Sequence, residues 1–115
     1  MKILRLLFGR WSHRQQALAL YQRAMAFANK HDHDAALADY TTVIETPSVP
    51  ADIRAMALYN RSVVHSATHD DEQAIRDLQQ VLEISGAAAN VRLEAKRKLV
   101  RIERAVNRLN DSQPP

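Results

Sequence analysis

Apolar residues recur at steps of three and four positions along most of this chain. In the first such stretch they are Ala17, Leu20, Ala24 and Phe27. Because an α-helix turns once every about 3.6 residues, positions at these steps share one face of a helix. The same spacing continues towards the C-terminus and predicts five helices, over residues 13–30, 33–46, 52–68, 71–84 and 90–109.

The predicted helices are separated by residues that favour helix ends. Asp32 and Asp70 stand where the second and fourth helices begin, and a short acidic side chain there can accept a hydrogen bond from the first turn. Gln73, three residues after Asp70, gives the fourth helix the spacing of a capping box. Residues that stop a helix follow the second and fourth segments, namely Pro47, Pro50, Ser85 and Gly86.

The pattern also repeats with a period of 38 residues. Residues 19–24 return as residues 57–62, and His31-Asp32 returns as His69-Asp70. Periods of this size are typical of stacked helical units, none of which buries its apolar face alone. We therefore predict an all-α fold, a short helical-hairpin solenoid. The predicted domain covers residues 13–110. It has one hairpin at 13–46, a second at 51–84 and a capping helix at 90–109, and a disordered tail follows at 111–115.

The composition is typical of a helical protein and indicates a cellular compartment. Hydrophobic residues make up 46% of the 115 residues and charged residues 25%, as in ordinary globular domains, and only two residues are glycine. Cysteine is absent, which excludes disulfides and a thiol nucleophile and favours a reducing compartment, so we expect a cytoplasmic protein. No apolar run reaches the about 20 residues that span a bilayer.

Charge is distributed unevenly, although the formal net charge is only +3. Residues 1–14 carry four basic side chains and no acid, and residues 91–108 carry seven basic side chains against two acids. Two basic ends around a near-neutral middle indicate an acidic partner or an anionic surface.

Bulky, small and aromatic residues occupy matching places in the two hairpins: Leu20, Ala24, Phe27, Ala36 and Tyr40, then Leu58, Ser62, His65, Ala74 and Leu78. In this pattern residues 17–105 resemble the tetratricopeptide repeat (TPR) family, and the second unit resembles a common bacterial variant. That family pairs two antiparallel helices in each repeat of about 34 residues. This chain departs from it at the internal turn, where His31 and His69 replace a small glycine.

The resemblance implies that the first helix of each unit lines a concave groove. Carried onto this chain, the groove residues are Tyr21, Gln22, Met25, Asn29, Tyr59, Asn60, Val63, Arg97, Lys98 and Arg101. Tyr, Asn and Met suit adaptable contacts, and the basic residues can hold a carboxylate or phosphate. We therefore predict a non-catalytic interaction module that binds a peptide segment or helix of another protein. The alternative is that this face is only the hydrated inner wall of a short array.

Five histidines raise the question of a metal site. His31 and His33 flank Asp32, and His65 and His69 lie one helical turn apart, a spacing that can place two imidazoles on one metal ion. We favour the alternative that His31 and His69 fill the same turn in two repeats and that His65 faces the core. A metal site needs three or four converging ligands, so we predict none.

Other candidate chemistry has a structural interpretation as well. Arg23 and Asp39 stand 16 residues apart, as do Arg61 and Asp77, and an ion pair within each hairpin is favoured over contact with a ligand. No nucleophile motif, phosphate-binding loop or pair of catalytic carboxylates occurs in the sequence. We expect neither enzymatic activity nor a cofactor.

The N-terminal segment, residues 1–12, is basic and amphipathic. If it is helical, one face carries five large apolar side chains, Ile3, Leu4, Leu7, Phe8 and Trp11. This face can seal the first repeat, which we favour because a short array has a bare apolar end. It can also lie in a membrane interface or pack on a protein groove.

Two other functions therefore stay open. The chain can be a peripheral membrane or anionic-surface adaptor tethered by residues 1–11. It can also be a nucleic-acid-associated factor that uses the arginine stripe of residues 97–108, although no aromatic residue interrupts that stripe and a capping helix needs a charged outer face anyway. The exposed end faces leave a homodimer open.

Overall fold

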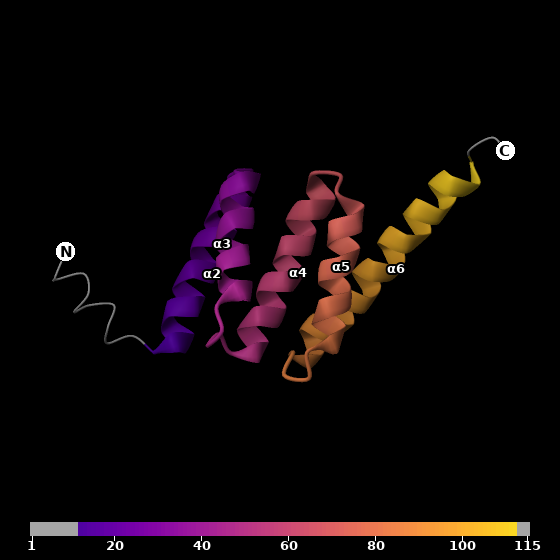
Figure 1. Cartoon of the computed structure of the whole chain (residues 1–115). Helices are drawn as coiled ribbons and strands as arrows, with labels where there is room; N and C mark the ends of the chain where they lie inside the picture. Colours follow the sequence, from indigo (N-terminus) through magenta and orange to yellow (C-terminus); the bar gives the residue numbers. More distant parts are fainter. Residues whose placement is uncertain (1–11, 113–115) are drawn as a thin grey trace.

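The computed structural model describes residues 12–112, and every regular element in this part of the chain is an α-helix (Figure 1). The helices are α2 (His13–Asn29), α3 (His33–Glu45), α4 (Ala51–Ala67), α5 (Asp71–Glu83) and α6 (Ala89–Asp111). The predicted all-α fold is confirmed, and each helix end lies within two residues of its predicted position. Of the predicted N-terminal segment, residues 1–12, only Ser12 is among the described residues. The predicted tail, residues 111–115, is wrong at its start because α6 continues through Asp111, and residues 113–115 lie outside the described residues.

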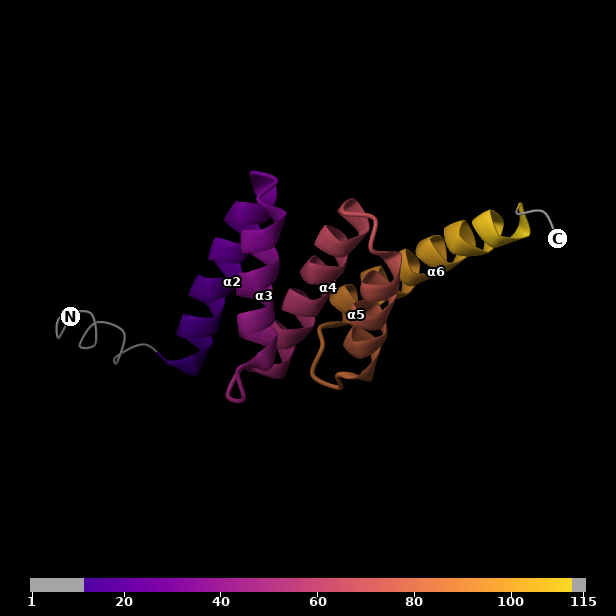
Figure 2. The same ribbon diagram turned by 45° about the horizontal axis from the view of Figure 1, so that its top comes forward.

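The helices pack mainly against their neighbours in the chain. α2 packs on α3 and α4 on α5, which gives two antiparallel hairpins, while α3 contacts α4 and α5 contacts α6. α4 also contacts both α2 and α6, so the first helices of successive units adjoin one another. Figure 2 shows the C-terminal half of α6 running past α5.

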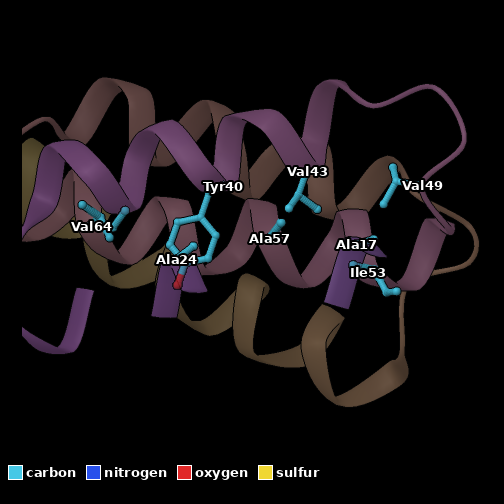
Figure 3. Close-up of a cluster of buried hydrophobic side chains, with 9 residues drawn as sticks. Ala17, Ala24, Tyr40, Val43, Val49, Ile53, Ala57 and Val64 are labelled. Carbon is cyan, nitrogen blue, oxygen red and sulfur yellow. The ribbon is translucent and has the colours of Figure 1, made fainter. Parts of the chain in front are cut away.

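The core is built around small residues where helices meet closely. Six alanines are completely buried, at least one in each helix: Ala24, Ala36, Ala55, Ala57, Ala74 and Ala95. Tyr40, Val43 and Ile53 fill the first cluster, between α2, α3 and α4 (Figure 3). Leu58 and Leu78 belong to the second cluster, between α4, α5 and α6. Since alanine lets two backbones approach, a larger side chain at these contacts would overpack the core.

The turns inside the two hairpins have the same backbone geometry. His31 and His69 both have left-handed backbones, with φ of 60° and 63°. At the first turn the amide of Asp32 donates to the carbonyl of Phe27 at 2.9 Å, and the amide of His31 donates to that of Ala28 at 3.0 Å. This is a Schellman motif, which satisfies the last carbonyls of α2.

The residue after each of these histidines begins the next helix. The carboxylates of Asp32 and Asp70 accept hydrogen bonds from the amides of Ala35 and Gln73, both at 3.3 Å, as the sequence predicts. A reciprocal capping box occurs instead at Ser12 and Gln15, where α2 begins.

The end of α5 corrects one sequence interpretation. The sequence places Ser85 and Gly86 at the end of this helix, with Gly86 as the glycine usual after a helix C-terminus, but Gly86 does not have the positive φ of such a cap. The helix ends at Glu83, with Ile84 as an extended cap. A methyl group at Gly86 would lie 2.8 Å from the Cβ of Ala51, so the glycine allows the loop to approach α4 closely.

Candidate binding pocket between α2 and α4

A pocket of about 270 Å³ opens between α2, α3 and α4. Met25 and Asn29 line it from α2, and Asn60 and Val63 line it from α4. All four belong to the predicted groove, and the contact between α2 and α4 brings them together. His31, His33 and Tyr40 complete the polar part of its lining. We call this site the α2–α4 pocket.

Tyr40 lines the pocket and packs beside Tyr21, which lies outside the lining. Tyr40 is 1% exposed, and the centre of its ring lies 6.0 Å from that of Tyr21 in a tilted arrangement of 56°. Burial, followed by the charge of Tyr21, raises the pKa of Tyr40 to about 12. Burial also raises the pKa of Tyr21. Both hydroxyls stay protonated at neutral pH, so Tyr40 contributes an uncharged side chain to the pocket lining.

Asn60 is fixed in position by its own hydrogen bonds. Its amide nitrogen donates to the hydroxyl of Tyr21 at 2.7 Å and to the carbonyl of Met56, one turn earlier in α4, at 2.9 Å. Because both N–H groups are thus used, Oδ1 is the atom that Asn60 has left to offer a ligand, as an acceptor. Tyr21 therefore orients Asn60, while Asn60 itself faces the pocket.

His33 carries an unsatisfied polar atom at this site. Its Nδ1 is buried and has no hydrogen-bond partner within residues 12–112. The ring of His31 stands edge-on to it, with ring centres 6.0 Å apart. Leaving a buried polar atom unpaired costs about 1–3 kcal/mol, and a ligand in the pocket can pair with Nδ1 only if the imidazole ring turns to expose it. His33 lies in the first turn of α3, where helical periodicity alone does not indicate a binding residue.

The corresponding place between α4 and α6 carries charged residues instead. The period of 38 residues relates His33 to Asp71 and Asn60 to Lys98. Burial lowers the pKa of Lys98, with a smaller effect of the nearby Arg101, while the charge of Asp71 opposes this shift. The places that correspond to His33 and Asn60 thus carry an aspartate and a lysine whose charges interact.

The other predicted groove residues are not in the α2–α4 pocket. Gln22 lies in a shallow hollow on α2 with Leu18, and Arg97 and Arg101 line a hollow on α6. Tyr59 packs against the second core cluster. The sequence thus identifies four pocket residues, Met25, Asn29, Asn60 and Val63, and misses His31, His33 and Tyr40.

The two arginine–aspartate pairs are ion pairs within the hairpins, as favoured from the sequence. Arg23 donates to both carboxylate oxygens of Asp39 at 2.7 and 2.9 Å, and Arg61 does the same to Asp77 at 2.8 and 2.7 Å. These carboxylates are buried, so the arginines neutralise charges inside the fold.

The described residues form neither a cluster of metal ligands nor a membrane-spanning helix. Within residues 12–112 no group of three or more histidine or acidic side chains is arranged to hold a metal ion. In the same range no helix is long and apolar enough to span a bilayer. The segment on which the membrane-adaptor alternative depends, residues 1–11, lies outside the described residues.

Comparison with known proteins yields no relative. No protein-family model matches this chain, and no curated protein matches it.

Proposed function

We propose that this chain is a non-catalytic, TPR-like interaction module that holds a segment of a partner protein in the α2–α4 pocket. The observation that carries the proposal is the pocket itself, with the unpaired Nδ1 of His33 and the acceptor Oδ1 of Asn60 beside apolar walls. An apolar site with a few fixed polar groups is the usual form of a binding pocket. Repeat proteins use surfaces between adjacent units in this way.

The pocket chemistry favours an apolar side chain flanked by peptide backbone. Met25 and Val63 stand on opposite walls and are 38% and 39% exposed, so they can cover an inserted side chain. The N–H groups of a peptide can pair with the oxygen of Asn60, and the imidazole of His33 can form a hydrogen bond with a peptide group. Both fixed polar groups therefore match the donors and acceptors of a peptide.

The test begins with selection of peptides from a displayed random library on the intact chain. Selected peptides should lose affinity by about tenfold or more on Val63→Arg, because the new charge occupies the pocket wall. Val100→Arg is the matched control, since Val100 is a valine of similar exposure, 43%, on α6 outside the pocket. Binding that ignores Val63→Arg in a folded variant, or a selection that enriches no peptide, rejects the proposal.

A second measurement reports on His33 directly. Imidazole nitrogen NMR should show the Nδ1 resonance of His33 shifting when a selected peptide binds, because that atom gains a hydrogen bond. His69→Gly, at the equivalent of His31 in the other hairpin, should leave both binding and this shift as in the parent. An Nδ1 resonance that is unchanged at saturation counts against the pocket.

A further inference from the structure

The outer face of α6 carries apolar side chains that no other described helix covers. Leu93 and Val100 are 47% and 43% exposed. They lie seven residues apart, about two helical turns, and so on one side of the helix. Ala95 and Ile102, on the opposite side, pack into the second core cluster. We use "outer face of α6" for the side that bears Leu93 and Val100.

The repeat relates this face to an internal contact of the second hairpin. Residues 38 positions earlier than Leu93, Lys96 and Val100 are Ala55, Leu58 and Ser62. These three side chains of α4 are at most 1% exposed, and Ala55 and Leu58 pack in one cluster with residues of α5. The outer face of α6 is therefore the counterpart of the face with which α4 completes a hairpin.

Basic side chains surround the apolar positions on this face. Val100 lies in a hollow of about 340 Å³ that is otherwise lined by Lys96, Arg97, Arg101 and Arg104. Of these, only Arg97 forms an ion pair within the described residues, with Glu94 at 2.9 Å. The charges of Lys96, Arg101 and Arg104 are therefore open to water or to a partner. An apolar floor with a basic rim matches an apolar side chain that has carboxylates beside it.

This charge pattern argues against two occupants from the chain itself. The α6 helix of a second copy would bring the same basic residues together. Residues 1–11 contain Lys2, Arg5 and Arg10 and no acid, so they are also repelled. By contrast, α5, which packs on the counterpart face of α4, carries four acids and one arginine.

We propose that the outer face of α6 binds an acidic amphipathic helix of a partner protein, which completes a third hairpin. The two apolar residues at heptad spacing receive the apolar side of that helix, and the basic rim pairs with its acids. Leu93 and Val100 favour a helix over nucleic acid, because a phosphate backbone makes no use of them and no aromatic residue stands here for base stacking. This surface is separate from the α2–α4 pocket.

The probe for this proposal is a synthetic copy of residues 70–84, the acidic helix of the second hairpin. A covalent link between positions 72 and 76, both exposed in α5, keeps the isolated peptide helical. The controls are the same peptide with every acid replaced by its amide, and a 20-nucleotide single-stranded RNA. Fluorescence anisotropy measures binding of each to the intact chain.

We expect the acidic helix to bind, the amide peptide to bind at least about tenfold more weakly, and the affinity to fall with added salt. Val100→Ser and Arg104→Glu should each weaken the acidic helix by about tenfold, whereas Val63→Arg should leave it unchanged. All three positions are exposed, and circular dichroism checks that each variant stays folded.

Three outcomes overturn the proposal: no binding of the acidic helix, equal binding of the amide peptide, or an affinity that ignores Val100→Ser. RNA that binds more tightly than the acidic helix and depends on Arg104 but not on Val100 assigns the face to nucleic acid instead. Because Val63→Arg affects only the α2–α4 pocket, failure here and failure of the proposed function are distinguishable.

Discussion

The guanidinium of Arg61 holds the carboxylate of Asp77 through two hydrogen bonds, from Nε to Oδ2 at 2.8 Å and from Nη2 to Oδ1 at 2.7 Å. Arg61 belongs to α4 and Asp77 to α5, so the pair joins the two helices of the second hairpin. Arg23 and Asp39 have the same arrangement in the first hairpin. The pairs differ in burial, because the side chain of Arg61 is 17% exposed and that of Arg23 is 63% exposed, and Arg61 also donates from Nη1 to the hydroxyl of Thr41 at 3.1 Å.

We predict that Arg61→Met lowers the free energy of unfolding by about 3–5 kcal/mol, because it leaves the buried carboxylate of Asp77 without its charge partner. Arg23→Met is the matched control and should cost clearly less, since water already reaches the guanidinium of Arg23. Urea denaturation at neutral pH measures both. Equal losses in the two variants would show that burial does not decide the strength of these pairs.

A second prediction concerns the left-handed turn at His69. A non-glycine residue with φ of 63° is strained, and glycine adopts this conformation without a steric cost. His69→Gly should therefore raise the free energy of unfolding by about 0.5–1 kcal/mol. His69→Val should lower it, because a β-branched residue tolerates this backbone least. Thermal melts of both variants test the point, and the prediction is wrong if they shift in the same direction.

The helix caps, Gly86 and the pocket residues show which features the sequence alone can predict and which it cannot. Asp32 and Asp70 are helix caps because of interactions within three residues, so the sequence alone identifies them. Gly86 was assigned to the wrong role, since the reason for it is a contact with Ala51, 35 residues away. The same limit applies to the binding residues. Asn60 repeats a helical pattern and was found, whereas His33 enters the pocket only because α3 packs between α2 and α4.

The surface that a helical residue faces is also harder to predict from the sequence than the helix itself. The TPR resemblance assigns Arg97, Lys98 and Arg101 to one groove. In the structure Lys98 is partly buried and lies near Asp71, while Arg97 and Arg101 line the hollow around Val100. Consecutive residues of a helix are separated by about 100° around its axis, so neighbours in sequence can serve different surfaces.

The buried tyrosines give a prediction about pH. Burial raises the pKa of Tyr40 to about 12, above its value of about 10 in the unfolded chain. Between these values the unfolded state loses a proton that the folded state keeps, so stability falls as pH rises from about 10 to 12. Tyr40→Phe, which has no proton to lose, should reduce this fall. Urea denaturation at several pH values measures it, and a parallel decline in both proteins would contradict the prediction.

The last prediction is that residues 2–11 stabilise the fold by covering its first hairpin. Directly after this segment, the N-terminal half of α2 and the end of α3 leave a hollow of about 130 Å³, lined in part by Ala17, Leu20 and Val43. If the segment is helical, one face of it carries five large apolar side chains, Ile3, Leu4, Leu7, Phe8 and Trp11. Each contributes about 1.5–3 kcal/mol if fully buried, which is large against the roughly 5–15 kcal/mol of a whole domain.

Deleting residues 2–11 keeps Ser12 and its capping box with Gln15, so the start of α2 is preserved. If the segment packs on the hollow, the melting temperature in lipid-free buffer should fall by about 4 °C or more, or the uncovered end should make the protein dimerise. If the segment serves only to contact lipid, the melt should be unchanged and binding to anionic liposomes should be lost. Replacing Leu20 with Ser tests the receiving surface, because in the intact chain it should lower the melting temperature more than it does in the deletion variant. Additive effects of the two changes would show that the segment and the hollow do not meet.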